Sequence, residues 1–229
     1  MKNILLTILV LLTANTCFSQ DLYKRTRKLT PYVTETYTYT IGTDREIKQG
    51  LYQAFYNKKF ALASGKYKDD QRVGIWHFLN RKGELIENFD YDTNTLQDES
   101  REDTTSNIQY LFDYEPKDKD VLTKPIRPGG RYFGYIPYLR VVKLPADIRE
   151  TNYRDYDVIL ELLISPGGLL ANYSVKLKSR WDENVYNLNI KQIPDEDRLF
   201  IPATVNRNPV SVRIAIYCHI NEDGNIDMN

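Results

Sequence analysis

The chain has 229 residues, of which 41% are hydrophobic and 27% are charged, a composition typical of a folded globular protein. Its 31 lysine and arginine residues equal its 31 aspartate and glutamate residues, which excludes a strong overall field for nucleic acid or acidic lipid. The 18 tyrosines favour strands and interfaces, because a tyrosine ring packs while its hydroxyl stays hydrated.

Residues 1–19 are predicted to be a cleaved signal peptide. Lys2 precedes the apolar run Ile4–Leu12, and small residues stand before a cut at Gln20. The run is shorter than the roughly 20 apolar residues that span a bilayer. Two alternatives stay open, namely retention of the segment as a weak inner-membrane anchor and lipidation of Cys17.

The next segment indicates strands and hairpins. Val33 to Ile41 alternates β-branched or aromatic residues with threonines, which predicts a strand. Gly50-Leu51-Tyr52 and Gly74-Ile75-Trp76 lie 24 residues apart, and polar turns follow at 57–59 and 80–83. This repetition predicts two stacked β-hairpins.

The stretch GKYKDDQRVGIWHFLNRKGELIENFDY, Gly65 to Tyr91, resembles the MORN-like repeats of bacterial envelope proteins. Those repeats combine G-x-Y, a short polar turn and G-x-W-x-F/Y. The resemblance implies a β-rich meander over residues 20–96 whose aromatic residues share one face. That face is either a binding surface or the core of the meander. Its aromatic residues are Tyr52, Tyr67, Trp76, Phe78 and Tyr91.

Residues 97–124 are predicted to be an acidic linker. The sequence from Thr93 onward is dense in acids and hydroxyls and buries too little apolar surface to offset its ordering entropy. Asp98 to Asp103 lacks the glycine and terminal glutamate of a calcium loop. One short apolar segment, Ile108 to Tyr114, is interpreted as a single strand.

The C-terminal half is predicted to mix helices and strands. Pro145 to Glu150 has proline in a first helical turn, and Asp182 to Pro194 has apolar residues at helical spacing. Between them, Asp155 to Ser179 alternates about a Ser165–Gly168 turn, which predicts an antiparallel pair. A final long strand follows from Pro209.

This order resembles the TonB C-terminal domain family. The resemblance rests on the segments PGG at 128–130, LPADIRE at 144–150, ISPGGLLANYSVKLKS at 164–179 and FIPATVNRNPVSVRIAIYCHI at 200–220. It implies that residues 125–222 form a small α+β domain with a three-stranded antiparallel sheet and two or three helices, before a polar tail at 223–229. The fold class expected for the chain is therefore α+β, a MORN-like meander followed by this domain.

The last strand is the candidate binding edge. In the TonB family the domain grips an extended peptide of an outer-membrane transporter, and exposed sheet edges recruit partner strands. The candidate partner-binding residues are Val210, Val212, Ile214, Ile216 and Tyr217. Pairing of this strand within the sheet, or in a homodimer, is the alternative.

No segment carries recognisable catalytic or cofactor-binding chemistry. His77, His219 and Cys218 lack further ligands at metal-site spacing, and no phosphate or dinucleotide fingerprint occurs. Cys218, the single cysteine after cleavage, is interpreted as a small buried hydrophobe rather than a reactive thiol. Basic residues do not cluster with aromatics, so nucleic-acid binding is not expected.

The sequence therefore predicts a non-enzymatic, exported envelope protein that binds a protein or peptide partner in the periplasm by strand addition. Association with the membrane is expected only if the N-terminal segment is retained. The alternatives are a membrane-anchored TonB-type energy transducer for outer-membrane transport and a hydrolase of cell-wall material, which would need a cluster of carboxylates in one cleft.

Overall fold

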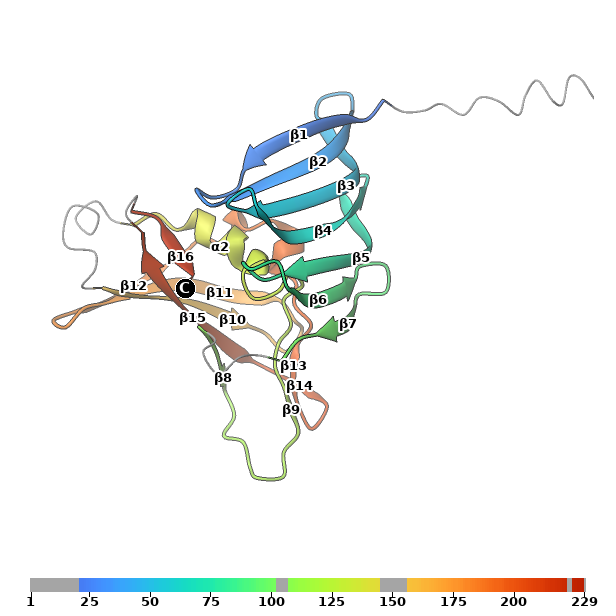
Figure 1. The fold of residues 1–229 in the computed structure, drawn as a ribbon. Helices are drawn as coiled ribbons and strands as arrows, with labels where there is room; N and C mark the ends of the chain where they lie inside the picture. Colours follow the sequence, from blue (N-terminus) through green and yellow to red (C-terminus); the bar gives the residue numbers. More distant parts are fainter. Residues whose placement is uncertain (1–20, 102–106, 145–155, 222–223, 229) are drawn as a thin grey trace, which may run out of the picture.

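The computed structural model describes residues 21–101, 107–144, 156–221 and 224–228. Its first sheet is an antiparallel meander of seven consecutive strands (Figure 1). These are β1 (Tyr23–Lys28), β2 (Val33–Ile41), β3 (Glu46–Tyr56), β4 (Phe60–Lys68), β5 (Gln71–Leu79), β6 (Leu85–Asp90) and β7 (Thr95–Glu99). The strand predicted from Val33 to Ile41 is confirmed as β2.

Tight turns and bulges shape this meander. Asn57 and Lys58, between β3 and β4, have φ of 49° and 57°, and Asp69 and Asp70, between β4 and β5, have φ of 50° and 65°. Two successive positive φ values are the geometry of hairpin turns that match the twist of the strands. Irregular register accompanies the turns, with shifts in the pairing of each adjacent pair from β2 to β7.

One face of the meander is an aromatic layer. Trp76 and Phe78 are fully buried, and the Trp76 ring lies 5.1 Å from that of Tyr52 and 5.2 Å from that of Tyr67. Gly65 makes room for this layer, because a Cβ atom on it would lie 2.2 Å from the Trp76 ring. The repeat aromatics therefore gather on one face, as expected, and form the core of the meander.

The second and third sheets complete an almost entirely β architecture. The second sheet has the order β12-β11-β10-β15-β16, with β8 also paired to β15, and the third has the order β14-β13-β9. Their strands are β8 (Ile108–Phe112), β9 (Leu122–Thr123), β10 (Asp157–Ile164), β11 (Leu170–Lys178), β12 (Glu183–Asn187), β13 (Ala203–Val205), β14 (Asn208–Val210), β15 (Val212–Ile220) and β16 (Ile226–Met228).

The α+β prediction is wrong. The described residues contain one short α-helix, α2 (Ile136–Val141), and three 3-10 turns at Phe133–Tyr135, Ile190–Gln192 and Asp195–Arg198. The helix predicted over 182–194 is instead β12 followed by a 3-10 turn. Ser179 closes a tight turn through its backbone bond to Asp182, at 2.8 Å, and thereby directs the chain back along β11. The helix predicted at 145–150 lies outside the described residues.

The predicted linker and polar tail also contain paired strands. Within residues 97–124, β8 joins the second sheet and buries Ile108, while β9 pairs with β13. Within the tail, β16 pairs with β15 and all three of its residues are buried. Partners far away in sequence supply the cross-strand contacts of β8 and β9, whereas β16 folds back on the nearby end of β15.

The predicted docking edge is not an edge. The long strand β15 pairs with β10 along one side and with β8 and β16 along the other. Val212, Ile214 and Ile216 are fully buried, and Val210 belongs to β14, whereas Tyr217 points outward with 37% exposure. Strand addition at Val210–Ile220 would require displacement of strands that are already paired.

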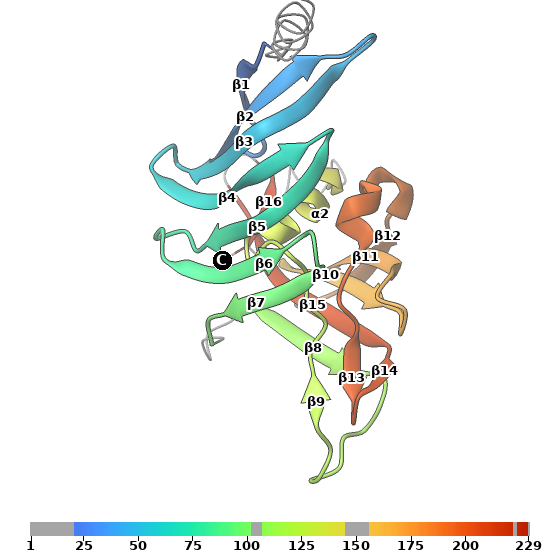
Figure 2. The same cartoon turned by 90° about the vertical axis from the view of Figure 1, so that its right-hand side faces the viewer.

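The two halves of the chain pack on each other. The Phe133 ring, just before α2, lies 6.0 Å from Phe78 and 6.2 Å from Tyr52 of the first sheet, and α2 lies between the two large sheets (Figures 1 and 2). Glu87 of β6 accepts bonds from the backbone N–H groups of Gly129 at 2.8 Å and Gly130 at 3.1 Å. One hydrophobic core thus runs through both halves.

We expect Gly65→Ala to destabilise the protein by about 1–3 kcal/mol, because the added methyl group overlaps the Trp76 ring. Denaturant unfolding measures this change. Gly167→Ala is the matched control, since its Cβ would come no closer than 3.8 Å to another residue. Equal stability of the two variants would contradict the packing described for Gly65.

We expect Glu87 to make stability depend on pH. Burial raises its pKa to about 7, against the opposing effect of the Gly129 and Gly130 bonds. A carboxyl group with a raised folded-state pKa holds its proton more tightly when folded. The free energy of unfolding therefore falls as pH rises from about 5 to about 7 and then levels off.

Relative to Glu87→Gln, the wild type is expected to lose on the order of 2 kcal/mol over this interval. Urea unfolding of both proteins at a series of pH values measures the difference. Parallel pH profiles for the two proteins would show that Glu87 does not titrate there.

Candidate functional site

A cleft with a volume of about 140 Å³ lies where the first sheet meets α2 and the turn that follows residue 193. Its walls combine aromatic and proline side chains with an unusual number of charges. The cationic residues are Arg27, Lys48, Arg72, Arg127 and Arg140. The acidic residues are Glu35, Glu196 and Asp197. Cations outnumber carboxylates in this cleft although the whole chain is neutral.

One wall is organised by a buried carboxylate on β2. Glu35 is only 2% exposed because it sits on the inward phase of the alternating strand, between Val33 and Tyr37. It accepts a hydrogen bond from the Tyr52 hydroxyl at 2.7 Å and forms an ion pair with Arg27 of β1. Burial, and next the Glu35 charge, raise the pKa of Tyr52 well above its usual value. The Tyr52 hydroxyl therefore stays protonated and serves as a donor.

The floor of the cleft is a charge cluster that joins both halves of the chain. Asp197 is paired with Arg127 and lies 3.5 Å from Arg72 of β5. Arg72 also donates to the hydroxyls of Tyr67 at 3.3 Å and Tyr91 at 3.2 Å. Because Asp197 is 5% exposed, each charge depends on its partners for the interactions that water would otherwise provide.

Lys48 of β3 projects into the same cleft. Its ammonium nitrogen lies over three tyrosine rings, 5.1 Å from the centroid of Tyr37, 5.7 Å from Tyr52 and 4.7 Å from Tyr67. Ring faces attract a cation without neutralising it. Burial lowers the pKa of Lys48, with partial compensation from Glu35.

A larger groove of about 640 Å³ adjoins the cleft on the other side of the charge cluster. Arg72, Arg127, Pro128 and Glu196 line both spaces. The groove is otherwise rich in apolar and glycine surface, from Tyr91, Gly167, Gly168, Leu199, Phe200, Ile201 and Pro202. Volumes between about 300 and 1,000 Å³ are typical of ligand sites. We call the cleft and the groove together the seam, because they lie where the meander (β1 to β7) meets the rest of the chain. The cleft is its polar end and the groove its apolar end.

The structure separates the two sets of candidate residues found in the sequence. The repeat aromatics lie at this seam, where the hydroxyls of Tyr52, Tyr67 and Tyr91 hold the charged residues in place. The strand residues Val212, Ile214 and Ile216 instead lie in the core of the second sheet. The repeat pattern in the sequence therefore indicated the tyrosines of the site but not its charged groups.

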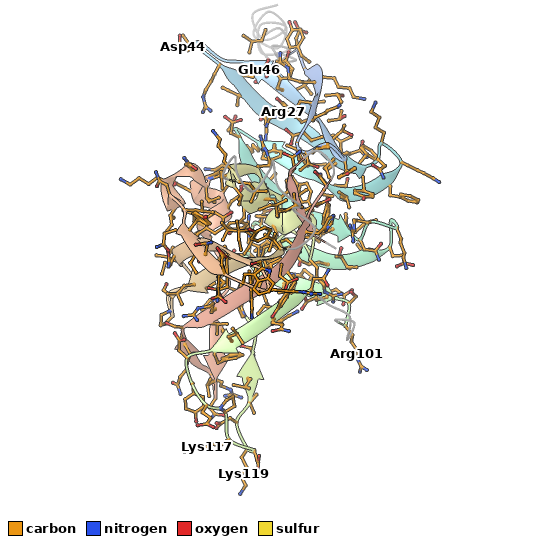
Figure 3. All side chains as sticks on the ribbon, turned by 90° about the vertical axis from the view of Figure 1, so that its left-hand side faces the viewer. Arg27, Asp44, Glu46, Arg101, Lys117 and Lys119 are labelled. Atoms are coloured by element: carbon orange, nitrogen blue, oxygen red, sulfur yellow. The ribbon has the colours of Figure 1, made fainter. Side chains whose placement is uncertain are left out.

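One signal for the charged groups was present in the sequence. Glu35 interrupts the buried phase of an otherwise apolar alternation, and a buried acid requires a partner. Arg72, Arg127 and Asp197 carry no comparable signal, because their partners lie far away along the chain. Lys117 and Lys119, by comparison, are exposed at the tip between β8 and β9 (Figure 3).

Cys218 and His77 lie outside this cleft and groove. Cys218 is 7% exposed, and burial raises the pKa of its thiol to about 12, which agrees with a structural role. His77 hydrogen bonds to Asn88 at 2.7 Å on the exposed surface. Across the described ranges, no cluster of three or more histidine, cysteine or acidic residues is arranged for a metal ion.

Comparison of the chain with family models, with curated proteins and with solved structures finds no match. The TonB and MORN resemblances therefore stay expectations from sequence segments, and the three-stranded α+β domain implied by the former is excluded by the observed sheets. No helix in the described part of the chain is long and apolar enough to cross a bilayer. The predicted signal or anchor segment lies outside that part.

We expect Asp197→Asn to destabilise the protein by about 3–5 kcal/mol, because the substitution leaves two buried arginines without their shared carboxylate. Urea unfolding measures the loss. Asp195→Asn, two residues earlier in the same turn, is the control, since the Asp195 side chain is 92% exposed. A similar small effect for both variants would contradict a structural role for the charge cluster.

Proposed function

We propose that this chain is a non-enzymatic binding protein of the cell envelope that takes an extended peptide segment of a partner protein into the seam between its halves. The observation that carries this proposal is the groove of about 640 Å³ that adjoins a cationic, tyrosine-lined cleft and shares Arg72, Arg127 and Pro128 with it. Ligand sites combine such apolar surface with a few fixed polar groups. Export rests on the apolar N-terminal run ahead of Gln20.

The arrangement of charges supports binding rather than acid–base catalysis. The carboxylates in the cleft, which a cell-wall hydrolase would need, are already committed to arginines. Glu35 pairs with Arg27, and Asp197 pairs with Arg127. These acids are therefore suited to fixing cations in position.

The groove also replaces the final strand as the place where a partner would dock. Both sides of β15 are already paired, so strand addition there is not available to a ligand. A peptide in the seam would instead contact side chains of both halves, including Tyr91 of the meander and Phe200 before β13. Such a ligand would bury apolar surface without separating any existing strand pair.

A random-peptide library displayed with free C-termini tests this function. We expect selected peptides to bind the wild type and to lose at least about tenfold in affinity on Leu199→Arg, because Leu199 is 53% exposed in the groove. Leu51→Arg is the matched control, since Leu51 is 50% exposed on β3 and lies outside the groove. Fluorescence anisotropy gives the affinities.

A library that yields no binder would contradict the proposal. So would selected peptides that bind wild type and Leu199→Arg with equal affinity, because their site would then lie elsewhere on the surface.

A further inference from the structure

The backbone of Lys48 is fixed, and no carboxylate of the described residues lies within 4.0 Å of its ammonium group. Its backbone N–H donates to the Asp70 carboxylate at 2.7 Å, and its backbone carbonyl accepts from the Asp70 N–H at 3.0 Å. The turn between β4 and β5 thus fixes the Lys48 backbone, while the rings of Tyr37, Tyr52 and Tyr67 surround its ammonium group. A fixed cation beside a cavity is a pre-organised recognition group.

The balance of charges that line the cleft favours the binding of one buried anion. Arg27, Arg72 and Arg127 each have a carboxylate within 4.0 Å. Among the described residues, no carboxylate lies that close to the Lys48 ammonium, and Arg140 stands exposed at the rim. A monoanion therefore matches the single unneutralised cation inside the cleft. A phosphate dianion would need a second uncompensated cation, whereas Arg27, Arg72 and Arg127 are each already paired with a carboxylate.

The apolar residues of the cleft would contact the part of the ligand that carries the anionic group. Phe133, Ile136 and Pro137 supply apolar contacts beside Lys48. Arg72 and Pro128 line both the cleft and the larger groove, so the two spaces are neighbours along the seam. A terminal carboxylate next to an apolar side chain, at the end of an extended peptide, fits both spaces.

We propose that Lys48 binds the C-terminal carboxylate of the peptide ligand, with the preceding residues running into the groove lined by Leu199 and Phe200. This inference rests on the proposed function and adds the polarity and the end group of the ligand. The Tyr52 hydroxyl, already bound to Glu35, holds one of the three rings that cage the cation. The loss of water around Lys48 on burial, reflected in its lowered pKa, strengthens its attraction to an entering anion.

The test compares the most strongly selected library peptide, synthesised with a free C-terminal carboxylate, with the same peptide ending in an amide. Titration calorimetry on the wild type is expected to show at least about tenfold tighter binding of the acid. Lys48→Met should abolish this difference. Lys66→Met, an exposed lysine on the neighbouring strand β4, should preserve it.

A pH series supplies a readout that does not depend on a substitution. The preference of the wild type for the acid is expected to decline as pH rises through the pKa of Lys48, below the range of an ordinary lysine. A merely structural lysine would not produce an acid preference with this pH dependence.

The outcomes separate the two claims. Equal binding of acid and amide to the wild type, with both weakened by Leu199→Arg, would overturn the role of Lys48 and leave the groove as the binding site. An acid preference that persists in Lys48→Met would also overturn that role. Affinities that are insensitive to Leu199→Arg would overturn the proposed function and this inference together.

Discussion

The structure depends most on the buried charge cluster around Asp197. This carboxylate lies between Arg127, in the segment before α2, and Arg72 on β5. It therefore joins the meander to the rest of the chain. Buried ion pairs contribute little net stability compared with apolar packing, but they strongly penalise any arrangement that separates them. The cluster thus sets the relative position of the two halves.

The same cluster borders the cleft. Arg72 lines both the cleft and the groove, and Asp197 lines the cleft. Tyrosines connect the aromatic core to the charge cluster, because their rings pack in the core while their hydroxyls bind the charged groups. The abundance of tyrosine in the sequence therefore has a structural cause. Lys48 differs from the other buried cations because aromatic faces, rather than a carboxylate, surround it.

Local patterns in the sequence predicted local structure well and long-range pairing poorly. The alternation from Val33 to Ile41, the turns at 57–59 and 80–83 and the hairpin about Ser165–Gly168 all depend on neighbouring residues, and they occur where expected. The strand expected within Ile108–Tyr114 occurs as β8, but its pairing with β15 depends on residues far away in the chain and was not predicted. The short strand β16 pairs with the nearby end of β15, although the composition of the last residues indicated only a polar tail. The predicted edge was wrong because neither pairing was predicted.

The candidate site shows the same division. Its aromatic wall followed from the repeated glycine and aromatic positions around Tyr52 and Trp76. Its ion pairs did not, because Arg72 and Asp197 are 125 residues apart and nothing local marks them as partners. The helix predicted over 182–194 failed for a related reason. The apolar residues there fit helical spacing, but the Ser179 turn and the free side of β11 favour a strand.

The most direct measurement is a crystal structure of the protein with a library-selected peptide. The account predicts electron density along the seam, with the terminal carboxylate within hydrogen-bond distance of the Lys48 ammonium and the preceding side chains against Leu199 and Phe200. Density for the peptide at the exposed edge strands β1 or β12, with an empty seam, would contradict it.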